Sequence, residues 1–326
     1  MSESEHAQFH QLQQYLNQKI IGQEGLTLRL LIALLADGHL LVEGAPGLAK
    51  TTAIKTLASG IEADFHRIQF TPDLLPADLT GTDIYRPQDG SFRFQHGPIF
   101  HNLVLADEIN RAPAKVQSAL LEAMAERQVT IGRNSYPLPE LFLVMATQNP
   151  IEQEGTYPLP EAQLDRFLMY VQVGYPNFES EKKIAQLVRE QGRTEARGLP
   201  AGWTPVPQKT VFAARKIILN LHLSPALEDY IVHLVMATRE PGKYAEDLGR
   251  WIRFGASPRA TIGLERCARA HAWLNGRDYV SPEDIHAIAH NVLSHRVLLS
   301  FEAEADGITP DRFVTEVLSR VDRKST

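Results

Sequence analysis

Cysteine is almost absent from this sequence: Cys267 is the one cysteine among 326 residues, so no internal disulfide can form. Long apolar runs are absent as well, because the longest, at residues 30–36, is far shorter than the roughly 20 residues that span a bilayer. Residues 1–10 are polar and lack the apolar core of a secretory signal. We therefore expect a cytoplasmic protein without membrane insertion.

Charge of one sign is not concentrated anywhere along the chain. The net charge is −6, the isoelectric point is near 6.1, and no dense block of lysine and arginine occurs. Proteins that bind nucleic acid or anionic lipid usually present such a block, so neither is a favoured partner, although a narrow basic pore in an assembly stays compatible with these values. Hydrophobic residues make up 44% of the chain and charged residues 22%, as in ordinary globular proteins.

Short apolar runs alternate with helical stretches in the first half of the chain. The apolar runs predict strands at residues 39–43, 65–70, 102–106, 141–146 and 167–173. Other stretches predict helices at residues 7–17, 24–36, 51–59 and 114–126. Strands that alternate with helices are typical of a parallel α/β sheet with right-handed crossovers.

Two segments interrupt this alternation and predict β-hairpins. Residues 80–100 contain alternating side chains on both sides of Asp89-Gly90, a pair typical of tight turns. Residues 127–139 have a similar pattern. Inserted hairpins tend to carry contacts rather than core, so we expect these two to contact a partner, with purely decorative surface hairpins as the alternative.

After residue 175 the pattern changes to helices. They are predicted at residues 179–191, 209–221, 225–239, 257–274, 281–299 and 309–321, with a linker rich in proline and glycine at 198–208. Two helix starts combine an N-cap residue with a proline, at Ser281-Pro282 and at Thr309-Pro310. The sequence therefore predicts an α/β domain at residues 1–175 and a smaller all-α domain at 176–326.

One loop carries the clearest chemical signal. Residues 44–51 read GAPGLAKT and match the phosphate-binding pattern G-x-x-x-x-G-K-[ST], except that Ala49 replaces the last glycine. A strand precedes the loop and a helix follows it, so backbone N–H groups can surround phosphate oxygens at a helix N-terminus. In this pattern Lys50 bridges the β- and γ-phosphates, and the Thr51 hydroxyl binds Mg²⁺. The predicted nucleotide contacts are Gly44, Ala45, Pro46, Gly47, Leu48, Ala49, Lys50, Thr51 and Thr52.

Alanine at position 49 suits this loop if the helix has already begun there. Gly44 and Gly47 supply the conformational freedom that the turn needs, and Ala49 directly precedes Lys50. We therefore expect Ala49 to have helical dihedral angles with a negative φ, and its N–H to face the phosphates.

Two later strands end in polar side chains. The run LVLADE ends in Asp107, which is expected to hold Mg²⁺, and in Glu108, which is expected to accept a proton from the attacking water. The strand at 141–146 leads to Asn149, whose neutral side chain can orient that water. Ligands bind where the carboxyl ends of parallel strands meet. Together these residues predict Mg²⁺-dependent hydrolysis of a nucleotide, and the absence of the motif NKxD favours ATP over GTP.

The segments GAPGLAKT, LADEINRA, ATQNP, LPEAQLDRF and GASPRA, in this order and spacing, resemble the MoxR family of AAA+ ATPases over nearly the whole chain. The GLAKT form of the loop is itself usual in that family. The resemblance implies an AAA+ P-loop sheet domain followed by a helical lid domain. The hairpins near residues 85–95 and 130 resemble the helix-2 insert and the pre-sensor insert of this AAA+ branch.

The resemblance assigns roles to two arginines. Arg166, in LPEAQLDRF, aligns with the arginine finger that enters the active site of a neighbouring subunit, and such a finger is worth about 10³–10⁵ in rate. The alternative for Arg166 is an arginine that binds the last carbonyls of a helix. Arg259, in GASPRA, aligns with the sensor 2 residue at the γ-phosphate. Because a cation is disfavoured at a helix start, we expect an anion paired with Arg259.

The resemblance also suggests three weaker assignments. Arg111, which follows the carboxylate pair, could point across a subunit interface. Ile21 and Gly22 resemble the segment beside adenine in AAA+ proteins, with a plain turn between two helices as the alternative.

An arginine finger that acts in a neighbouring subunit implies a ring, for which we expect a hexamer with ATP at each interface. The family is associated with chaperone-like remodelling or maturation of partner proteins, often ones with a von Willebrand factor A domain. This chain lacks the D-x-S-x-S motif of such domains, so the partner would be a separate polypeptide.

Two other functions stay open. A nucleic-acid motor would need basic hairpins, but Arg86 and Arg93 are balanced by Asp83 and Asp89. A scaffold that uses ATP only to assemble would have no need of a general base at position 108.

Overall fold

The computed structural model describes residues 3–150, 155–193 and 203–322. Contacts between Cα atoms divide the chain into two units. The sheet unit comprises Ala7–Leu159 and Val171–Phe212. The helical unit comprises Met1–His6, Pro160–Tyr170 and Ala213–Thr326.

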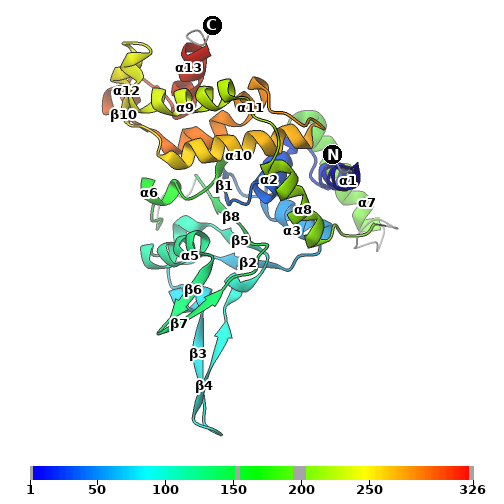
Figure 1. Ribbon diagram of the computed structural model, residues 1–326. Helices are drawn as coiled ribbons and strands as arrows, with labels where there is room; N and C mark the ends of the chain where they lie inside the picture. The colour runs from blue at the N-terminus through cyan, green and yellow to red at the C-terminus, as the bar shows by residue number, and fades with distance from the viewer. Residues whose placement is uncertain (1–2, 151–154, 194–202, 323–326) are drawn as a thin grey trace. The chain divides into compact units, whose positions relative to one another are not determined.

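A five-stranded parallel sheet forms the core of the sheet unit (Figure 1). Its strands, in spatial order, are β2 (Phe65–Gln69), β5 (Leu103–Asp107), β8 (Leu143–Gln148), β1 (Leu40–Gly44) and β9 (Met169–Val173). The first four residues of both β5 and β8 are completely buried. Continuous apolar runs form such central strands because both faces of a parallel sheet are covered. All five predicted strands are confirmed.

The predicted helices of this unit are confirmed with small differences at their ends. They are α1 (Glu3–Lys19, in this unit from Ala7 onward), α2 (Glu24–Leu35), α3 (Lys50–Gly60), α5 (Ala114–Glu126) and α7 (Phe178–Arg193). The unit also contains a short helix that the sequence did not predict, α4 (Pro76–Thr80). The contacts group α7 with the sheet, although the sequence places it after residue 175. The domain boundary near residue 175 stays a prediction.

The register of the sheet brings the ends of neighbouring strands together. Gln69 at the end of β2 lies opposite Asp107 at the end of β5, and Glu43 on β1 lies opposite Gln148 on β8. The loops that follow β1, β5 and β8 therefore leave the sheet at one edge, which is where open parallel sheets bind their ligands.

Both predicted hairpins are present. They are formed by β3 (Gly81–Arg86) with β4 (Ser91–His96) and by β6 (Gln128–Ile131) with β7 (Asn134–Pro137). The rings of Phe94 and Tyr136 stack with centroids 4.0 Å apart, which joins the two hairpins near their bases. Tyr85 and Phe92 pair with each other farther toward the tip of the first hairpin, and both side chains are exposed. The expected contact with a partner stays a prediction.

The helical unit contains most of the helices predicted for the second half of the chain. They are α8 (Gln208–Leu219, in this unit from Ala213 onward), α9 (Pro225–Arg239), α10 (Pro258–Leu274), α11 (Pro282–Leu293) and α13 (Pro310–Asp322). The unit also contains two short helices that the sequence did not predict, α6 (Glu161–Leu164) and α12 (Phe301–Ala305).

The all-helical prediction was wrong at one place. The helix expected at 281–299 ends at Leu293, and Leu298–Leu299 form β11, which pairs with β10 (Ile252–Phe254). Two short apolar segments can satisfy their backbone groups in this way, and the helical pattern did not reveal the pairing. Among the described residues no helix has both the length and the apolar character that crossing a bilayer requires.

One buried carboxylate joins α10 to the start of α11. The Asp284 side chain is completely buried and accepts hydrogen bonds from His271 Nδ1 at 2.6 Å and from Arg277 Nη1 at 2.7 Å. The Ser281 N–H, at the N-cap of α11, donates to the same carboxylate at 2.9 Å. These donors outweigh the opposing effect of burial and lower the pKa of Asp284 to about 2.

Asp284→Asn is expected to lower the free energy of unfolding at pH 7 by about 2 kcal/mol, since each pKa unit corresponds to about 1.4 kcal/mol. The pKa is depressed in the folded state, so this stability is present above about pH 4 and is lost as the pH falls toward 2. Urea unfolding followed by circular dichroism should show the difference between wild type and variant shrinking below pH 4. The exposed Asp278→Asn is the matched control, and an Asp284→Asn variant as stable as this control would contradict the prediction.

Candidate functional site

The loop between β1 and α3 requires glycine at two positions. A Cβ atom on Gly44 would lie 2.7 Å from the carbonyl oxygen of Val173, so the neighbouring strand leaves no room for a side chain there. Gly47 has φ +84°, which side chains rarely tolerate. The loop thus passes close to the sheet and then turns sharply before α3 begins at Lys50.

The expectation for Ala49 was wrong. Its dihedral angles are φ 57° and ψ 16°, in the left-handed region, and it is the N-cap residue of α3. Its carbonyl already accepts the first helical hydrogen bond, from Ala53 N at 2.9 Å, but its own backbone has not yet entered the helix. The last position of the pattern therefore belongs to the turn, which explains why glycine suits it. The expected direction of the Ala49 N–H stays a prediction.

Lys50 folds back over the loop that precedes it. Its Nζ atom donates a hydrogen bond to the Gly44 carbonyl at 2.5 Å. Burial lowers the pKa of the Lys50 ammonium from its ordinary value, and the negative charges of Asp107, Glu108 and Glu43 oppose that shift. The ammonium is thus held against the start of the loop, within electrostatic reach of the carboxylates of Asp107 and Glu108.

Asp107 and Glu108 are fixed by Thr147 on the adjacent strand β8. The Thr147 hydroxyl donates to Asp107 Oδ1 at 2.6 Å and accepts from the Glu108 N–H at 2.9 Å. Glu108 has φ 58°, a left-handed conformation that costs on the order of 1–2 kcal/mol for a residue with a side chain. The chain therefore turns abruptly after β5 and directs the two carboxylates differently.

Two residues on β2, which the sequence did not single out, contact these carboxylates. Arg67 donates to Asp107 Oδ2 from Nε at 2.9 Å and from Nη2 at 2.7 Å. Gln69 donates to Glu108 Oε2 from Nε2 at 2.7 Å. Their spacing of two on a strand was a usable signal, since it places both on one face. The missing information was the strand order, which puts β2 beside β5.

Arg111 also contacts Glu108 within the same chain, from Nη1 to Oε2 at 3.2 Å. Its expected position across a subunit interface stays a prediction.

A cavity of about 320 Å³ gathers these groups at the edge of the sheet. Its lining residues are Pro46, Gly47, Leu48, Ala49, Lys50, Thr51, Thr52, Arg67, Asp107, Glu108 and Asn149. Asn149 is almost completely buried. The cavity thus brings together the loop, the carboxylate pair and the asparagine that the sequence predicts at one site. Gly44 and Ala45, at the start of the loop, do not line the cavity.

The segment expected beside adenine lies against another part of the sheet unit. Gly22 has φ +76°, and a Cβ atom on it would lie 2.8 Å from the Ser180 Cβ on α7. The neighbouring Gln23 donates from Nε2 to the Gly174 carbonyl at 2.9 Å. Ile21 and Gly22 therefore belong to a tight turn that packs on the segment before α7, and their contact with a base stays a prediction.

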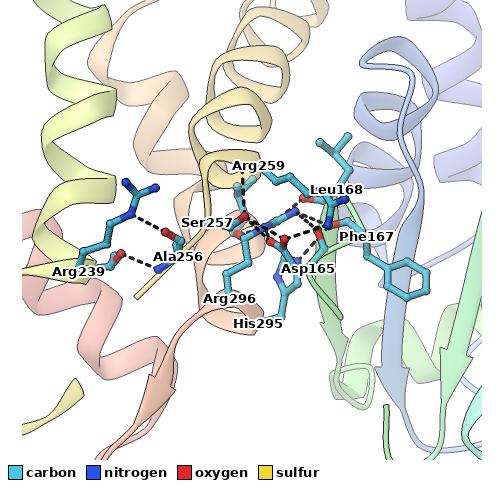
Figure 2. Close-up of polar contacts among 11 residues, drawn as sticks. Asp165, Phe167, Leu168, Arg239, Ala256, Ser257, Arg259, His295 and Arg296 are labelled. Carbon is cyan, nitrogen blue, oxygen red and sulfur yellow. Dashed lines mark hydrogen bonds and ion pairs between the residues drawn. The ribbon is translucent and has the colours of Figure 1, made fainter. Parts of the chain in front are cut away.

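Arg166 and Arg259 belong to the helical unit. Arg259 Nη1 donates to Asp165 Oδ2 at 3.1 Å (Figure 2), so the anion expected beside this helix-start cation is present. Arg166 is partly buried and directly follows Asp165 in the chain. The cavity described above belongs to the sheet unit, so the roles of both arginines at a nucleotide stay predictions.

Two family models match the chain. The one described as "ATPase family associated with various cellular activities (AAA)" matches residues 39–169, and the one described as "AAA lid domain" matches residues 249–317. The first match covers the phosphate loop, both carboxylates and Arg166, and the second covers Arg259.

Two named proteins and one solved structure are similar to this chain over most of their length. Chaperone MoxR1 of Mycobacterium tuberculosis is 48% identical over 309 residues, which cover 93% of this chain and 78% of that protein. Protein MoxR of Paracoccus denitrificans is 34% identical over 318 residues, 94% of this chain and 93% of that protein. A crystal structure of a protein from Cytophaga hutchinsonii matches with a TM-score of 0.89 and 47% identity, covering 97% of this chain and 95% of that one.

Ala49→Gly is expected to raise the free energy of unfolding by about 1 kcal/mol, because glycine relieves a left-handed conformation that strains alanine. Thermal or urea unfolding without nucleotide measures the change. Lys55 is exposed and lies within the same helix α3, so Lys55→Gly is the matched control. It should lower the free energy of unfolding by about 1 kcal/mol, because glycine is unfavourable where the backbone is helical. A loss of stability in Ala49→Gly would contradict the left-handed conformation.

Proposed function

Because the chain belongs to the MoxR family of AAA+ ATPases, we propose that it hydrolyses ATP and uses the cycle to remodel or mature a separate partner protein. The observation that carries this proposal is the cavity in which Lys50, Asp107, Glu108 and Asn149 meet. A non-hydrolysing scaffold would need the loop and its lysine, but it would not need donors that orient a carboxylate for proton transfer, such as those that contact Glu108.

The phosphates would lie on the loop before α3. The N-terminus of this 11-residue helix carries unpaired N–H groups and a partial positive charge, which suit an anion. Lys50 lies inside the same loop, and its hydrogen bond to the Gly44 carbonyl would be exchanged for phosphate oxygens. Loop residues from Gly44 to Thr52 would supply the remaining contacts.

Thr51 and Asp107 are the residues that would hold Mg²⁺. Both line the cavity, and Asp107 Oδ2 already accepts a hydrogen bond from the Arg67 guanidinium, a cationic group that lines the same cavity. A hydroxyl and a carboxylate oxygen are ligands that Mg²⁺ prefers. Bound Mg²⁺ would supply neutralisation of the charge on the β- and γ-phosphates.

Glu108 would act as the general base, and Asn149 would orient the water that attacks. Gln69 and Arg111 both donate to Glu108 Oε2, at 2.7 Å and 3.2 Å, so one oxygen is held while the carboxylate as a whole stays partly exposed. General-base catalysis of this kind is worth about 10²–10⁴ in rate.

We further propose a homo-oligomeric ring, a hexamer, in which Arg166 completes the neighbouring subunit's site and Arg259 contacts the γ-phosphate. Support comes from the family, whose arginine finger and sensor 2 align with these residues. The partner protein would be recognised outside the nucleotide site, with the exposed aromatic residues Tyr85 and Phe92 on the first hairpin as candidate contacts. We also propose that the partner carries a von Willebrand factor A domain and that this protein is cytoplasmic.

Glu108→Gln is expected to reduce ATP turnover by about 10²–10⁴-fold while nucleotide binding is kept, because the amide cannot accept the proton. Turnover per subunit should be measured across protein concentrations together with the mass of the assembly. In the wild type it should rise cooperatively with concentration if rings complete the site. Glu122→Gln, an exposed carboxylate on α5, is the matched control and should match the wild type. A Glu108→Gln enzyme that turns over like this control would contradict the assignment.

Arg67→Gln is expected to lower the Mg²⁺ concentration needed for half-saturation by about two- to fivefold, because the guanidinium competes for Asp107. That factor corresponds to about 0.5–1 kcal/mol for a half-exposed ion pair. Mg²⁺ is titrated into protein saturated with a fluorescent, non-hydrolysable ATP analogue. Arg93→Gln on the hairpin serves as the control for the loss of one positive charge. A higher Mg²⁺ requirement in Arg67→Gln would show that Arg67 assists the metal instead.

A further inference from the structure

Asp107 lies on the middle one of three neighbouring strands, and each of its carboxylate oxygens is bound from a different side. The strands are β2, β5 and β8 in spatial order, and Asp107 ends β5. From β8, the Thr147 hydroxyl donates to Oδ1 at 2.6 Å. From β2, Arg67 donates to Oδ2, from Nε at 2.9 Å and from Nη2 at 2.7 Å. Among the described residues no other side chain donates to either oxygen, so each oxygen has its own partner.

The hydrogen bond from Thr147 to Asp107 has a fixed direction. A threonine hydroxyl has one hydrogen to donate. The Glu108 N–H donates to Thr147 Oγ1 at 2.9 Å, so this oxygen acts as an acceptor toward Glu108 and gives its one hydrogen to Asp107 Oδ1. Thr147 is 1% exposed and does not line the cavity, so solvent has almost no access to it. The buried hydroxyl therefore keeps Oδ1 occupied whatever the cavity contains.

The contact between Arg67 and Asp107 is of a different kind. The Arg67 side chain is 50% exposed and lines the cavity together with Asp107. An ion pair as exposed as this contributes little to stability, so Arg67 can give up its place to another cation. Oδ2 is therefore the oxygen at which a cation in the cavity would meet Asp107, and it is the same oxygen that Arg67 already binds.

We propose that Thr147 is a positioning residue, which closes Asp107 Oδ1 and thereby assigns Oδ2 to Mg²⁺. This rests on the proposed function, in which Asp107 holds the metal. Because Oδ2 is also bound by Arg67, the arginine and the metal exclude each other as long as the Thr147 hydroxyl is present. Without that hydroxyl the carboxylate can turn, so that one oxygen keeps Arg67 and the other serves the metal. Thr147 thus determines whether Arg67 competes with the metal at all.

The test is a double-mutant cycle of Thr147→Val and Arg67→Gln. It is measured as the Mg²⁺ concentration that half-saturates the protein in the presence of a fluorescent, non-hydrolysable ATP analogue. In the wild-type background Arg67→Gln should lower this concentration by about two- to fivefold, because a half-exposed competitor is removed. In the Thr147→Val background it should lower the concentration by less than about 1.5-fold, because the arginine and the metal no longer share an oxygen.

Two further backgrounds separate this role from a general effect on the fold. Thr147→Ser keeps the hydroxyl, and Arg67→Gln should have its full effect there. Thr27→Val is the matched control, because Thr27 is also completely buried in the sheet unit and donates to Asn17 Oδ1 at 2.6 Å, but does not line the cavity. In this background as well, Arg67→Gln should keep its full effect.

An effect of Arg67→Gln that is equal in the wild-type and Thr147→Val backgrounds would overturn the proposal, since the competition would then not depend on the hydroxyl. A wild-type background in which Arg67→Gln fails to lower the Mg²⁺ requirement would overturn it too. If Thr147→Val does not fold, a crystal structure of the wild type with Mg²⁺ and the analogue decides. Thr147 should still donate to Asp107 Oδ1, and a metal held by Oδ1 would refute the assignment.

The cycle measures binding, so its outcome is independent of hydrolysis. A wild type that binds the analogue but does not turn over ATP would refute the proposed hydrolysis, and the cycle would still test Thr147. A wild type that binds no analogue in the presence of Mg²⁺ would refute the proposed nucleotide site, and the role of Thr147 with it.

Discussion

The alignment of strand ends at one edge of the parallel sheet is the constraint on which the whole candidate site depends. β1, β5 and β8 are neighbours, and their register places the residues that follow each strand side by side. The phosphate loop, the carboxylate pair and Asn149 are separated by dozens of residues in the chain, yet they line one cavity. Thr147 shows how tight this alignment is, because one hydroxyl on β8 fixes both residues at the end of β5.

The sequence predicted those elements whose signal is local. Apolar runs located all five strands, and the motif spacing located Lys50, Thr51, Asp107 and Glu108 at one site. Ala49 was misjudged because the motif gives no dihedral angle, and Ala49 lies in the turn just before the first helical residue, Lys50. Arg67, Gln69 and the pairing of β10 with β11 were missed because they depend on which segments are neighbours in space. The anion beside Arg259 followed from electrostatics, but its identity as Asp165 required the fold.

Arginines occupy two kinds of position in this protein. Arg296 is buried and holds backbone carbonyls, so removing its anion would leave a buried charge unpaired. Arg67 and Arg259 are about half exposed and each pairs with one carboxylate. Such exposed pairs are weak and can be exchanged for a metal ion or a phosphate at little cost. Under the proposed function, the contacts of Arg296 maintain the fold, and the ion pairs of Arg67 and Arg259 are the ones that a metal ion or nucleotide would replace.

A crystal structure with Mg²⁺ and a non-hydrolysable ATP analogue tests the central claim most directly. We predict phosphates on the loop that precedes α3, with Lys50 Nζ moved from the Gly44 carbonyl to the phosphates and Arg67 displaced from Asp107 Oδ2. Nucleotide bound elsewhere, or bound here with both contacts unchanged, would contradict the account.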